Sequence, residues 1–223
     1  MKKDKKSILM KNGGILISHK GYFATRVEDI TKESGVAKGT FYIYFKSKEE
    51  MFITILNEKL KEYLETSDRL IKKKVNLKWK IYNLTLDFLK LITENIGIFK
   101  TSMEISCIEG NATGEKIRNI MIESNKKIIE NICLYLYEGL ITREINEKYR
   151  NSVKELALIY DTIRAQYFLK KLMNISFDKQ VKEGSYTSLN SKFDGINIAI
   201  NEISIEKEAE FITDMFFGGV QKS

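Results

Sequence analysis

The 223-residue chain contains no proline, one histidine and only two cysteines. It has no run of about 18 apolar residues, so we expect no membrane-spanning helix. The apolar run Ile15-Leu16-Ile17 is too short to form a signal peptide. Cys107 and Cys133 form no CxxC pattern, which without an export signal predicts reduced thiols in the cytoplasm. Their spacing leaves open whether either thiol senses oxidation or packs as a small apolar group.

The residues needed for catalysis are equally scarce. His19 stands alone, and the chain has no glycine-rich phosphate loop, HExxH, GxSxG or Cys/His metal spacing. Neighbouring carboxylates such as Glu49 and Glu50 are interpreted as surface charges. We therefore expect no catalytic residues, no metal and no cofactor. An enzyme and a helical small-molecule-binding protein remain as alternatives.

Positive charge is concentrated at the N-terminal end of the chain. The net charge is +7, and residues 1–50 carry 11 Lys/Arg against 6 Asp/Glu. The other 173 residues carry 26 and 24, so their excess is small. A basic segment of this kind is the electrostatic footprint expected of a nucleic-acid-binding surface, although a solvated basic tail would give the same count.

The first 51 residues contain the pattern of a helix-turn-helix. Thr25 and Glu28 have the spacing of a capping box, which predicts the start of a helix that runs to Ser34. Gly35 can adopt the left-handed conformation that ends this helix. A second helix is predicted over 38–45, and Ser47 with Glu50 marks the start of the next. In a helix-turn-helix the second helix enters the DNA major groove.

This segment resembles the DNA-binding domain of the tetracycline-repressor (TetR) family of bacterial transcriptional regulators. The resemblance covers about a fifth of the chain without a gap. Its matching pieces are Gly21-Tyr22, Ala24-Thr25, Val27-Glu28-Asp29-Ile30, Gly35-Val36-Ala37-Lys38-Gly39-Thr40-Phe41-Tyr42, Tyr44-Phe45 and Ser47-Lys48-Glu49. The pair Gly13-Gly14 departs from the family pattern, which usually has small helix formers at these positions of the first helix. Each glycine inside a helix costs up to about 1 kcal/mol relative to alanine.

The resemblance implies an all-α protein with two domains. A three-helix helix-turn-helix domain is expected over 1–50, and a helical effector-binding and dimerisation domain over 51–223. The apolar pattern after Ser47 is helical nearly throughout. We predict helices over 47–72, 77–94, 98–108, 114–140, 152–173 and 205–217, with Gly97 as a break and Gly218-Gly219 as an end. The polar stretch 174–201 is predicted to include a short extended segment near 196–200.

The DNA contacts follow from which face of the second helix is apolar. Phe41 and Phe45 are four residues apart and should face the core, which leaves the opposite side for the groove. Lys38 can donate to guanine, and Ile43 can touch a thymine methyl group. In the family, the positions of Tyr42 and Lys48 bind phosphates. The predicted DNA-binding residues are Arg26, Lys38, Gly39, Thr40, Tyr42, Tyr44 and Lys48.

The last two long helices are apolar on more than one side, so each needs a second partner besides its own core. The family resemblance suggests that this partner is the same pair of helices in a second subunit. A homodimer is also what a palindromic operator requires. A single thick core is the alternative. The predicted interface consists of Ala157, Phe168, Phe211, Ile212, Met215 and Phe216.

The family's C-terminal domain usually encloses a pocket for a small ligand, and this chain supplies many aromatic residues in the corresponding helices. The candidate ligand-binding residues are Trp79, Tyr82, Phe88, Phe99, Met103, Cys107, Tyr135, Tyr160, Arg164 and Tyr167. Few buried charges are evident, which favours an apolar or amphipathic effector. The sequence thus predicts a cytoplasmic repressor that binds double-stranded DNA and is released by this effector. A non-specific architectural DNA-binding protein is the alternative within the same class.

Overall fold

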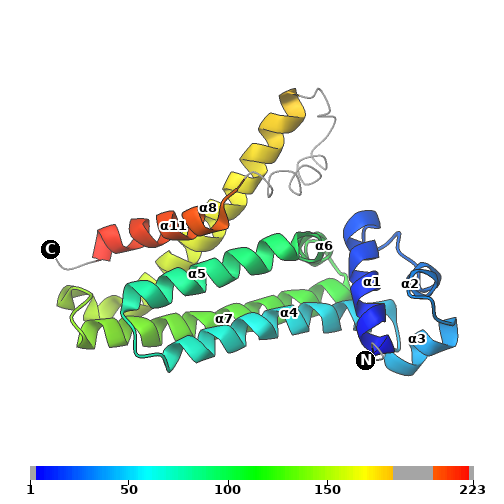
Figure 1. Ribbon diagram of the computed structural model, residues 1–223, viewed down its shortest axis with the longest axis horizontal. Helices are drawn as coiled ribbons and strands as arrows, with labels where there is room; N and C mark the ends of the chain where they lie inside the picture. The colour runs from blue at the N-terminus through cyan, green and yellow to red at the C-terminus, as the bar shows by residue number, and fades with distance from the viewer. Residues whose placement is uncertain (1–3, 183–202, 221–223) are drawn as a thin grey trace. The chain divides into compact units, whose positions relative to one another are not determined.

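The computed structural model describes residues 4–182 and 203–220, with the backbone alone at 169 and 172–182. In these ranges the regular elements are helices, which confirms the predicted all-α class (Figure 1). They are α1 (Lys5–Lys20), α2 (Val27–Glu33), α3 (Lys38–Tyr44), α4 (Lys48–Ile71), α5 (Leu77–Glu94), α6 (Ile96–Ser106), α7 (Ala112–Ile141), the 3-10 helix η1 (Glu147–Ser152), α8 (Val153–Lys182) and α11 (Ile205–Val220).

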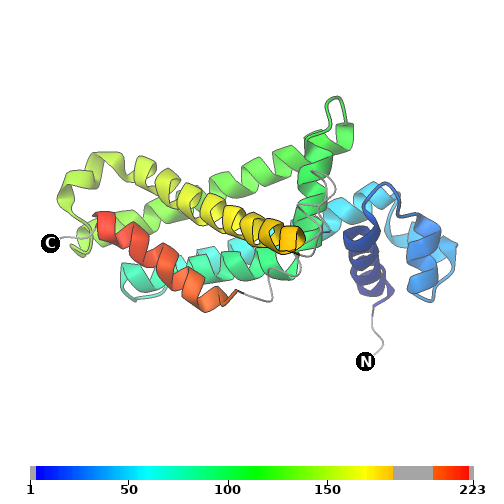
Figure 2. The ribbon, with the colours of Figure 1, turned by 90° about the horizontal axis from the view of Figure 1, so that it is seen from above.

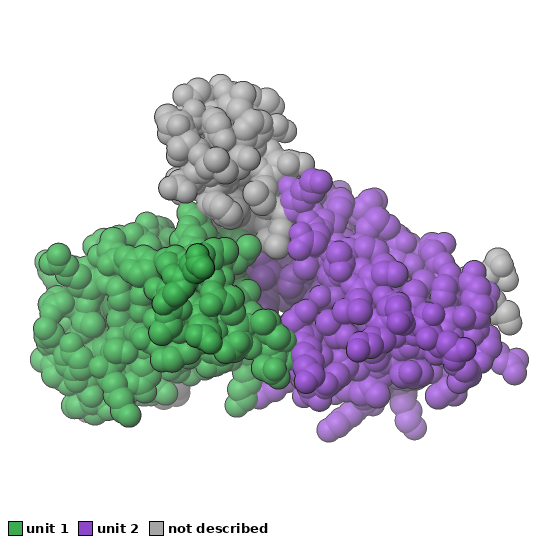
Figure 3. All heavy atoms as spheres, turned by 180° about the vertical axis from the view of Figure 1, so that it is seen from behind, with its two compact units in different colours: residues 1–62, 95–124 green, residues 63–94, 125–223 purple. Residues whose placement is uncertain are grey.

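The chain forms two compact units, coloured separately in Figure 3. Unit 1 comprises residues 1–62 and 95–124, and unit 2 comprises residues 63–94 and 125–223. Helices α4 and α7 each contribute one part to unit 1 and the other part to unit 2.

In unit 1, helix α1 packs against α2, α3 and α6. Its two glycines lie on its buried side and explain how it approaches its neighbours. A methyl group at Gly13 would lie 2.5 Å from Met51 Cε, and one at Gly14 would lie 3.6 Å from Ile98 Cδ1. The weak helix propensity of Gly13-Gly14 is therefore offset by close packing against α4 and α6.

Gly97 was predicted to break the chain between two helices, and this prediction is wrong. It lies at the second position of α6, and Asn95 alone separates α5 from α6. A methyl group at Gly97 would lie 2.3 Å from Ser18 Cβ and 2.9 Å from Ser18 Cα. The glycine is needed because the backbones of α1 and α6 are in close contact there.

In unit 2, α11 packs against both α5 and α8, as the two views in Figures 1 and 2 show. The core is formed by apolar side chains from α5, the C-terminal part of α7, α8 and α11. Its fully buried members include Leu84, Ile132, Leu136, Ala157, Phe168 and Ile212.

Two helix ends in unit 2 differ from the prediction. Helix α11 continues through Gly218-Gly219 to Val220, because partners near η1 bind its last carbonyl groups. The Tyr149 hydroxyl donates to Gly219 O at 2.9 Å, and Asn146 N donates to Val220 O at 3.3 Å. Helix α8 runs nine residues beyond Met173, into the predicted polar stretch. The predicted extended segment at 196–200 lies outside the described residues.

The Gly97 contact yields a test of packing. Gly97→Ala should lower the free energy of unfolding by about 1–3 kcal/mol, because the added methyl group overlaps the Ser18 backbone. Gly218→Ala is the matched control, since its added methyl group would have no packing partner within 4 Å. It should raise the free energy of unfolding by up to about 1 kcal/mol. Chemical denaturation of both variants measures the difference, and a stabilised Gly97→Ala would contradict the close contact.

Candidate nucleic-acid interface and buried polar cluster

Helices α2 and α3 form the predicted helix-turn-helix of unit 1. Gly35 follows α2 with a φ of 64°, the left-handed conformation expected at this position. Val36 N then donates to Thr31 O at 3.0 Å, which closes the turn. Phe41 and Phe45 are both buried, so the predicted core face of the second helix is confirmed. The opposite face of α3 is consequently directed away from the core.

That face presents a mixture of polar and apolar groups to solvent. Lys38 and Gly39 are exposed, Tyr42 is 51% exposed and Ile43 is 77% exposed. Thr40 and Tyr44 are half-buried, and Arg26 before α2 is exposed. The predicted contact residues from Lys38 to Tyr44 belong to one short helix, which is the geometry required of a helix that reads a DNA groove.

The capping of α2 differs from the predicted Thr25–Glu28 box, which is wrong. The Thr25 hydroxyl donates to Gly21 O at 2.8 Å and so ties the turn to the end of α1. Helix α2 begins after Arg26, whose backbone N–H donates to the Asp29 carboxylate at 3.1 Å. The box is shifted by one residue because Thr25 is buried and committed to α1.

Lys48 has a structural role in addition to its predicted phosphate contact. Its ammonium group donates to the backbone carbonyls of Tyr22 and Thr25, the latter at 2.6 Å. The same nitrogen lies 4.2 Å from the centroid of the Tyr22 ring. Partial burial lowers the pKa of the Lys48 ammonium. This side chain therefore joins the start of α4 to the turn between α1 and α2.

Lys38 is held by an ion pair to Glu28 of α2. Both side chains are more than half exposed, so the pair is screened by solvent and is weak. The hydrogen bond from Lys38 lowers the pKa of the Glu28 carboxyl. A DNA base would have to compete with this carboxylate for the Lys38 ammonium.

The candidate ligand-binding residues divide between the two units. Phe99 is buried in unit 1, where Met103 and Cys107 are exposed. The other candidates belong to unit 2, where Tyr135, Tyr160 and Arg164 are buried, Tyr82, Phe88 and Tyr167 are half-buried, and Trp79 is 37% exposed. Three of these residues, Phe88, Tyr160 and Arg164, lie in one cluster.

The centre of this cluster is the Arg164 guanidinium of α8, whose side chain is 2% exposed. It donates to the Asp161 carboxylate and to the Tyr63 hydroxyl. The Phe88 ring lies with its centroid 4.1 Å from Arg164 Cζ. Tyr160 lies nearby and donates or accepts a hydrogen bond with Thr85 at 2.7 Å. Charge, hydroxyl groups and aromatic rings thus share one buried region.

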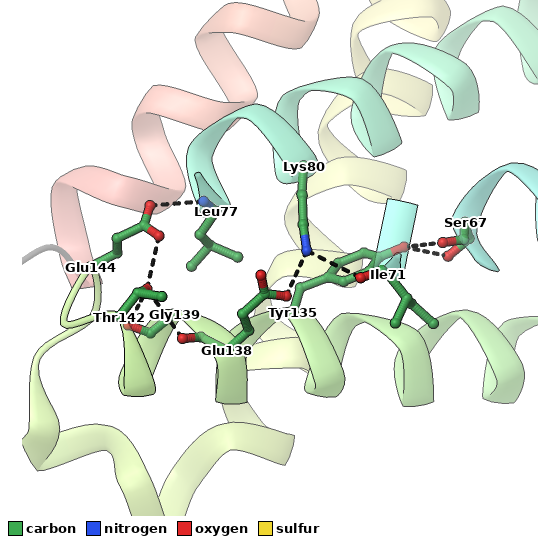
Figure 4. A network of polar contacts seen from close by, with 9 residues as sticks. All are labelled: Ser67, Ile71, Leu77, Lys80, Tyr135, Glu138, Gly139, Thr142 and Glu144. Atoms are coloured by element: carbon green, nitrogen blue, oxygen red, sulfur yellow. Dashed lines mark hydrogen bonds and ion pairs between the residues drawn. The ribbon is translucent and has the colours of Figure 1, made fainter. Parts of the chain in front are cut away.

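Two further polar contacts lie in unit 2 (Figure 4), and the sequence analysis missed Lys80 and the Ser67 partner of Tyr135. Lys80 is 1% exposed, and its ammonium contacts the Glu138 carboxylate of α7 at 2.5 Å. The Tyr135 hydroxyl is hydrogen-bonded to Ser67 of α4. The burial of Lys80 could have been predicted from its spacing. It stands three residues after Leu77 and four before Leu84, on the apolar face of the helix.

The predicted interface residues fall into two groups. Phe211 and Met215 of α11 are 50% and 42% exposed. On α8, Leu158 and Ile159, which follow Ala157 in the sequence, are also exposed. The remaining predicted members, Ala157, Phe168, Ile212 and Phe216, are buried inside the protomer. The exposed members of the predicted interface are therefore Phe211 and Met215, both on α11.

The helix-turn-helix segment matches a known family in sequence. The sequence profile described as "Bacterial regulatory proteins, tetR family" matches residues 14–55, which include α2, α3 and their turn. The fatty acid metabolism regulator protein of Bacillus subtilis (strain 168) is 31% identical over 134 residues, covering 59% of this chain and 66% of that protein. Residues 14–55 therefore belong to the TetR family of DNA-binding domains.

Solved structures are similar in fold over nearly the whole length of the chain. The fatty acid degradation regulator FadR from Bacillus halodurans has a TM-score of 0.66 at 15% identity, covering 98% of this chain and 97% of that one. The regulator FadR from Bacillus subtilis, crystallised with stearoyl-CoA, has a TM-score of 0.60 at 22% identity, covering 89% and 99%. At these identities the likeness establishes the fold. The alignment to the sequence relative spans just under two thirds of that relative's length.

Within the described ranges, no helix is long and apolar enough to cross a membrane.

Proposed function

We propose that this TetR-family protein is a homodimeric transcriptional repressor, released from its operator by an amphipathic small molecule with a long acyl chain. The observation that carries the proposal is the exposed face of α3, with Lys38, Tyr42 and Ile43 opposite a buried pair of phenylalanines. A short helix with this division of faces, placed second in a helix-turn-helix, fits the major groove.

The groups on α3 are suited to different parts of DNA. The Lys38 ammonium can donate to guanine O6 or N7, and the Ile43 side chain can contact a thymine methyl group. Two of the three Lys48 donors are taken by backbone carbonyls, which leaves one for a phosphate. Base reading is therefore assigned to Lys38, and backbone positioning to Lys48.

Two observations support an effector with a long acyl chain. The sequence relative is named as a regulator of fatty acid metabolism, and one similar structure contains stearoyl-CoA. Unit 2 of this chain buries aromatic rings together with polar groups, the combination that an apolar chain with a polar head requires. An architectural DNA-binding protein would have no need of such a unit.

Lys38 and Lys48 should respond differently to substitution. Lys38→Met should reduce the binding free energy for the operator by about 1–3 kcal/mol and relax the base preference at one position per half-site. Lys48→Met should weaken binding to operator and to random DNA equally. It should also lower the slope of log K against log salt concentration by about one. Glu28→Gln, which removes the partner of Lys38, should instead tighten binding. Fluorescence titration at several salt concentrations measures all three, and equal sequence-independent losses for both lysines would contradict the assignment.

The proposed dimer depends on the exposed residues of α8 and α11. Phe211→Glu and Met215→Glu should give folded monomers, because a carboxylate buried at the interface costs several kcal/mol while each site is half-exposed in the protomer. Leu134→Glu on α7, where Leu134 is 51% exposed, is the matched control and should remain dimeric. Analytical ultracentrifugation at micromolar concentration measures the oligomeric state of each variant. A monomeric wild type that binds a palindromic operator tightly would refute the interface.

The effector proposal is tested by release of DNA. Stearoyl-CoA should lower operator affinity by about 5- to 150-fold, the range of typical allosteric coupling. Free coenzyme A and acetyl-CoA are controls, because they carry the same head without a long apolar chain. The measurement is a gel-shift or fluorescence titration of operator at saturating ligand. If long-chain acyl compounds raise the thermal stability of the protein but leave operator affinity unchanged, the repressor is not controlled by them.

A further inference from the structure

Arg164 is the largest fully buried side chain among the described residues, and its charge is enclosed in unit 2. Three aromatic rings surround the guanidinium. The distances from Cζ to the ring centroids are 4.1 Å for Phe88, 5.6 Å for Tyr63 and 5.7 Å for Tyr160. Such rings attract a cation through their electron-rich faces, and they exclude water from it.

The charge of Arg164 is already balanced by one carboxylate. The Asp161 oxygen Oδ1 accepts a hydrogen bond from Arg164 Nη2, while Oδ2 accepts one from the Asn125 amide at 3.3 Å. Burial raises the pKa of the Tyr63 hydroxyl, and it raises the pKa of Tyr160 to about 12. Both phenols therefore remain neutral at physiological pH, and the cluster has no net charge.

One nitrogen of the guanidinium remains without any hydrogen-bond partner. Arg164 Nη1 donates to the Tyr63 hydroxyl and Nη2 donates to Asp161, but Nε has no hydrogen-bond acceptor among the described residues and is buried. Buried donors in native proteins are almost always satisfied, and an exception calls for an explanation. A ligand oxygen would complete the hydrogen bonding of this group.

We infer that Arg164 Nε–H binds the neutral carbonyl oxygen of an acyl ester, thioester or amide. This inference rests on the proposed acyl effector and specifies how its head is recognised. A free carboxylate would add a second negative charge beside Asp161 in a region of low dielectric, whereas a carbonyl oxygen adds none. The rings of Tyr63 and Phe88 would lie beside the adjoining hydrocarbon. The site should accordingly prefer neutral acyl derivatives of any of these kinds to the corresponding free acids.

The test compares ligands that differ only at the carbonyl group. Palmitoyl-CoA and its thioether analogue S-hexadecyl-CoA differ by one oxygen, and methyl laurate and laurate differ in charge. Isothermal titration should show the thioester binding about tenfold more tightly than the thioether, as expected for a hydrogen bond from a charged donor. Methyl laurate and lauramide should each bind more tightly than laurate, which distinguishes a neutral carbonyl from an anion.

Arg164→Lys keeps the positive charge beside Asp161 but removes the Nε donor, so the thioester-to-thioether ratio should fall close to one. Tyr63→Phe is the matched control, because it alters the same cluster and leaves Nε intact, so the tenfold ratio should persist. If Arg164→Lys does not fold, the uncharged double variant Arg164→Met/Asp161→Asn serves the same comparison. A purely structural arginine would change stability in these variants without changing the ratio.

The outcomes separate this inference from the proposed function. If stearoyl-CoA releases operator but the ratio persists in Arg164→Lys, the carbonyl contact is refuted and the proposed function stands. Tighter binding of laurate than of methyl laurate also refutes the contact, since it requires a site for an anion. If none of these acyl compounds binds, both the contact and the acyl effector are refuted, while operator binding by α3 is unaffected.

Discussion

The close approach of α1 to α6 is the contact on which unit 1 depends. At Gly97 the two backbones are so near that a methyl group would overlap the Ser18 backbone. Helix α1 also packs against α2 and α3, so its position fixes the base on which the helix-turn-helix lies. Because packed interiors deform little, a displacement of α6 must be accompanied by a displacement of α1 or by the loss of this contact.

Unit 2 is organised by a different constraint, the burial of charged groups. Arg164 with Asp161, and Lys80 with Glu138, place two cations almost entirely out of water. Desolvation makes such pairs poor contributors to stability compared with apolar residues of similar size. Each pair instead holds its two partners in one specific arrangement. In the Arg164 pair, the unpartnered Nε is the group proposed to bind the ligand carbonyl.

Local patterns in the sequence predicted the helices well where the helix ends are decided locally. The bounds of α5 agree with the predicted 77–94, and Gly35 ends α2 as its conformational freedom suggested. The predicted helix ends were wrong where a residue distant in the sequence determines where the helix ends. Gly97 and Gly218 resemble helix breakers in the sequence, yet one accommodates Ser18 and the other lies in a helix whose end is held by Tyr149 and Asn146.

The candidate site shows the same division. The spacing of Phe41 and Phe45 predicted the buried face of α3 correctly, and the exposed face is the opposite side of the same helix. The partners of Lys48 and the Tyr63 contact of Arg164 could not be predicted, because tertiary packing brings Tyr22, Thr25 and Tyr63 to them. Tyr63 does stand seven residues after Leu56 and seven before Leu70 on one face of α4, a pattern that marks it as buried but does not identify its partner.

The protein is proposed to couple the binding of an acyl ligand to the binding of operator DNA, and thermodynamic reciprocity tests this coupling most directly. The dissociation constant of stearoyl-CoA should be measured by titration calorimetry for the free protein and for the operator complex. Coupling predicts that the ligand binds the free protein more tightly, by the same factor by which it weakens operator binding. Equal affinity of the ligand for the two forms would contradict the claim.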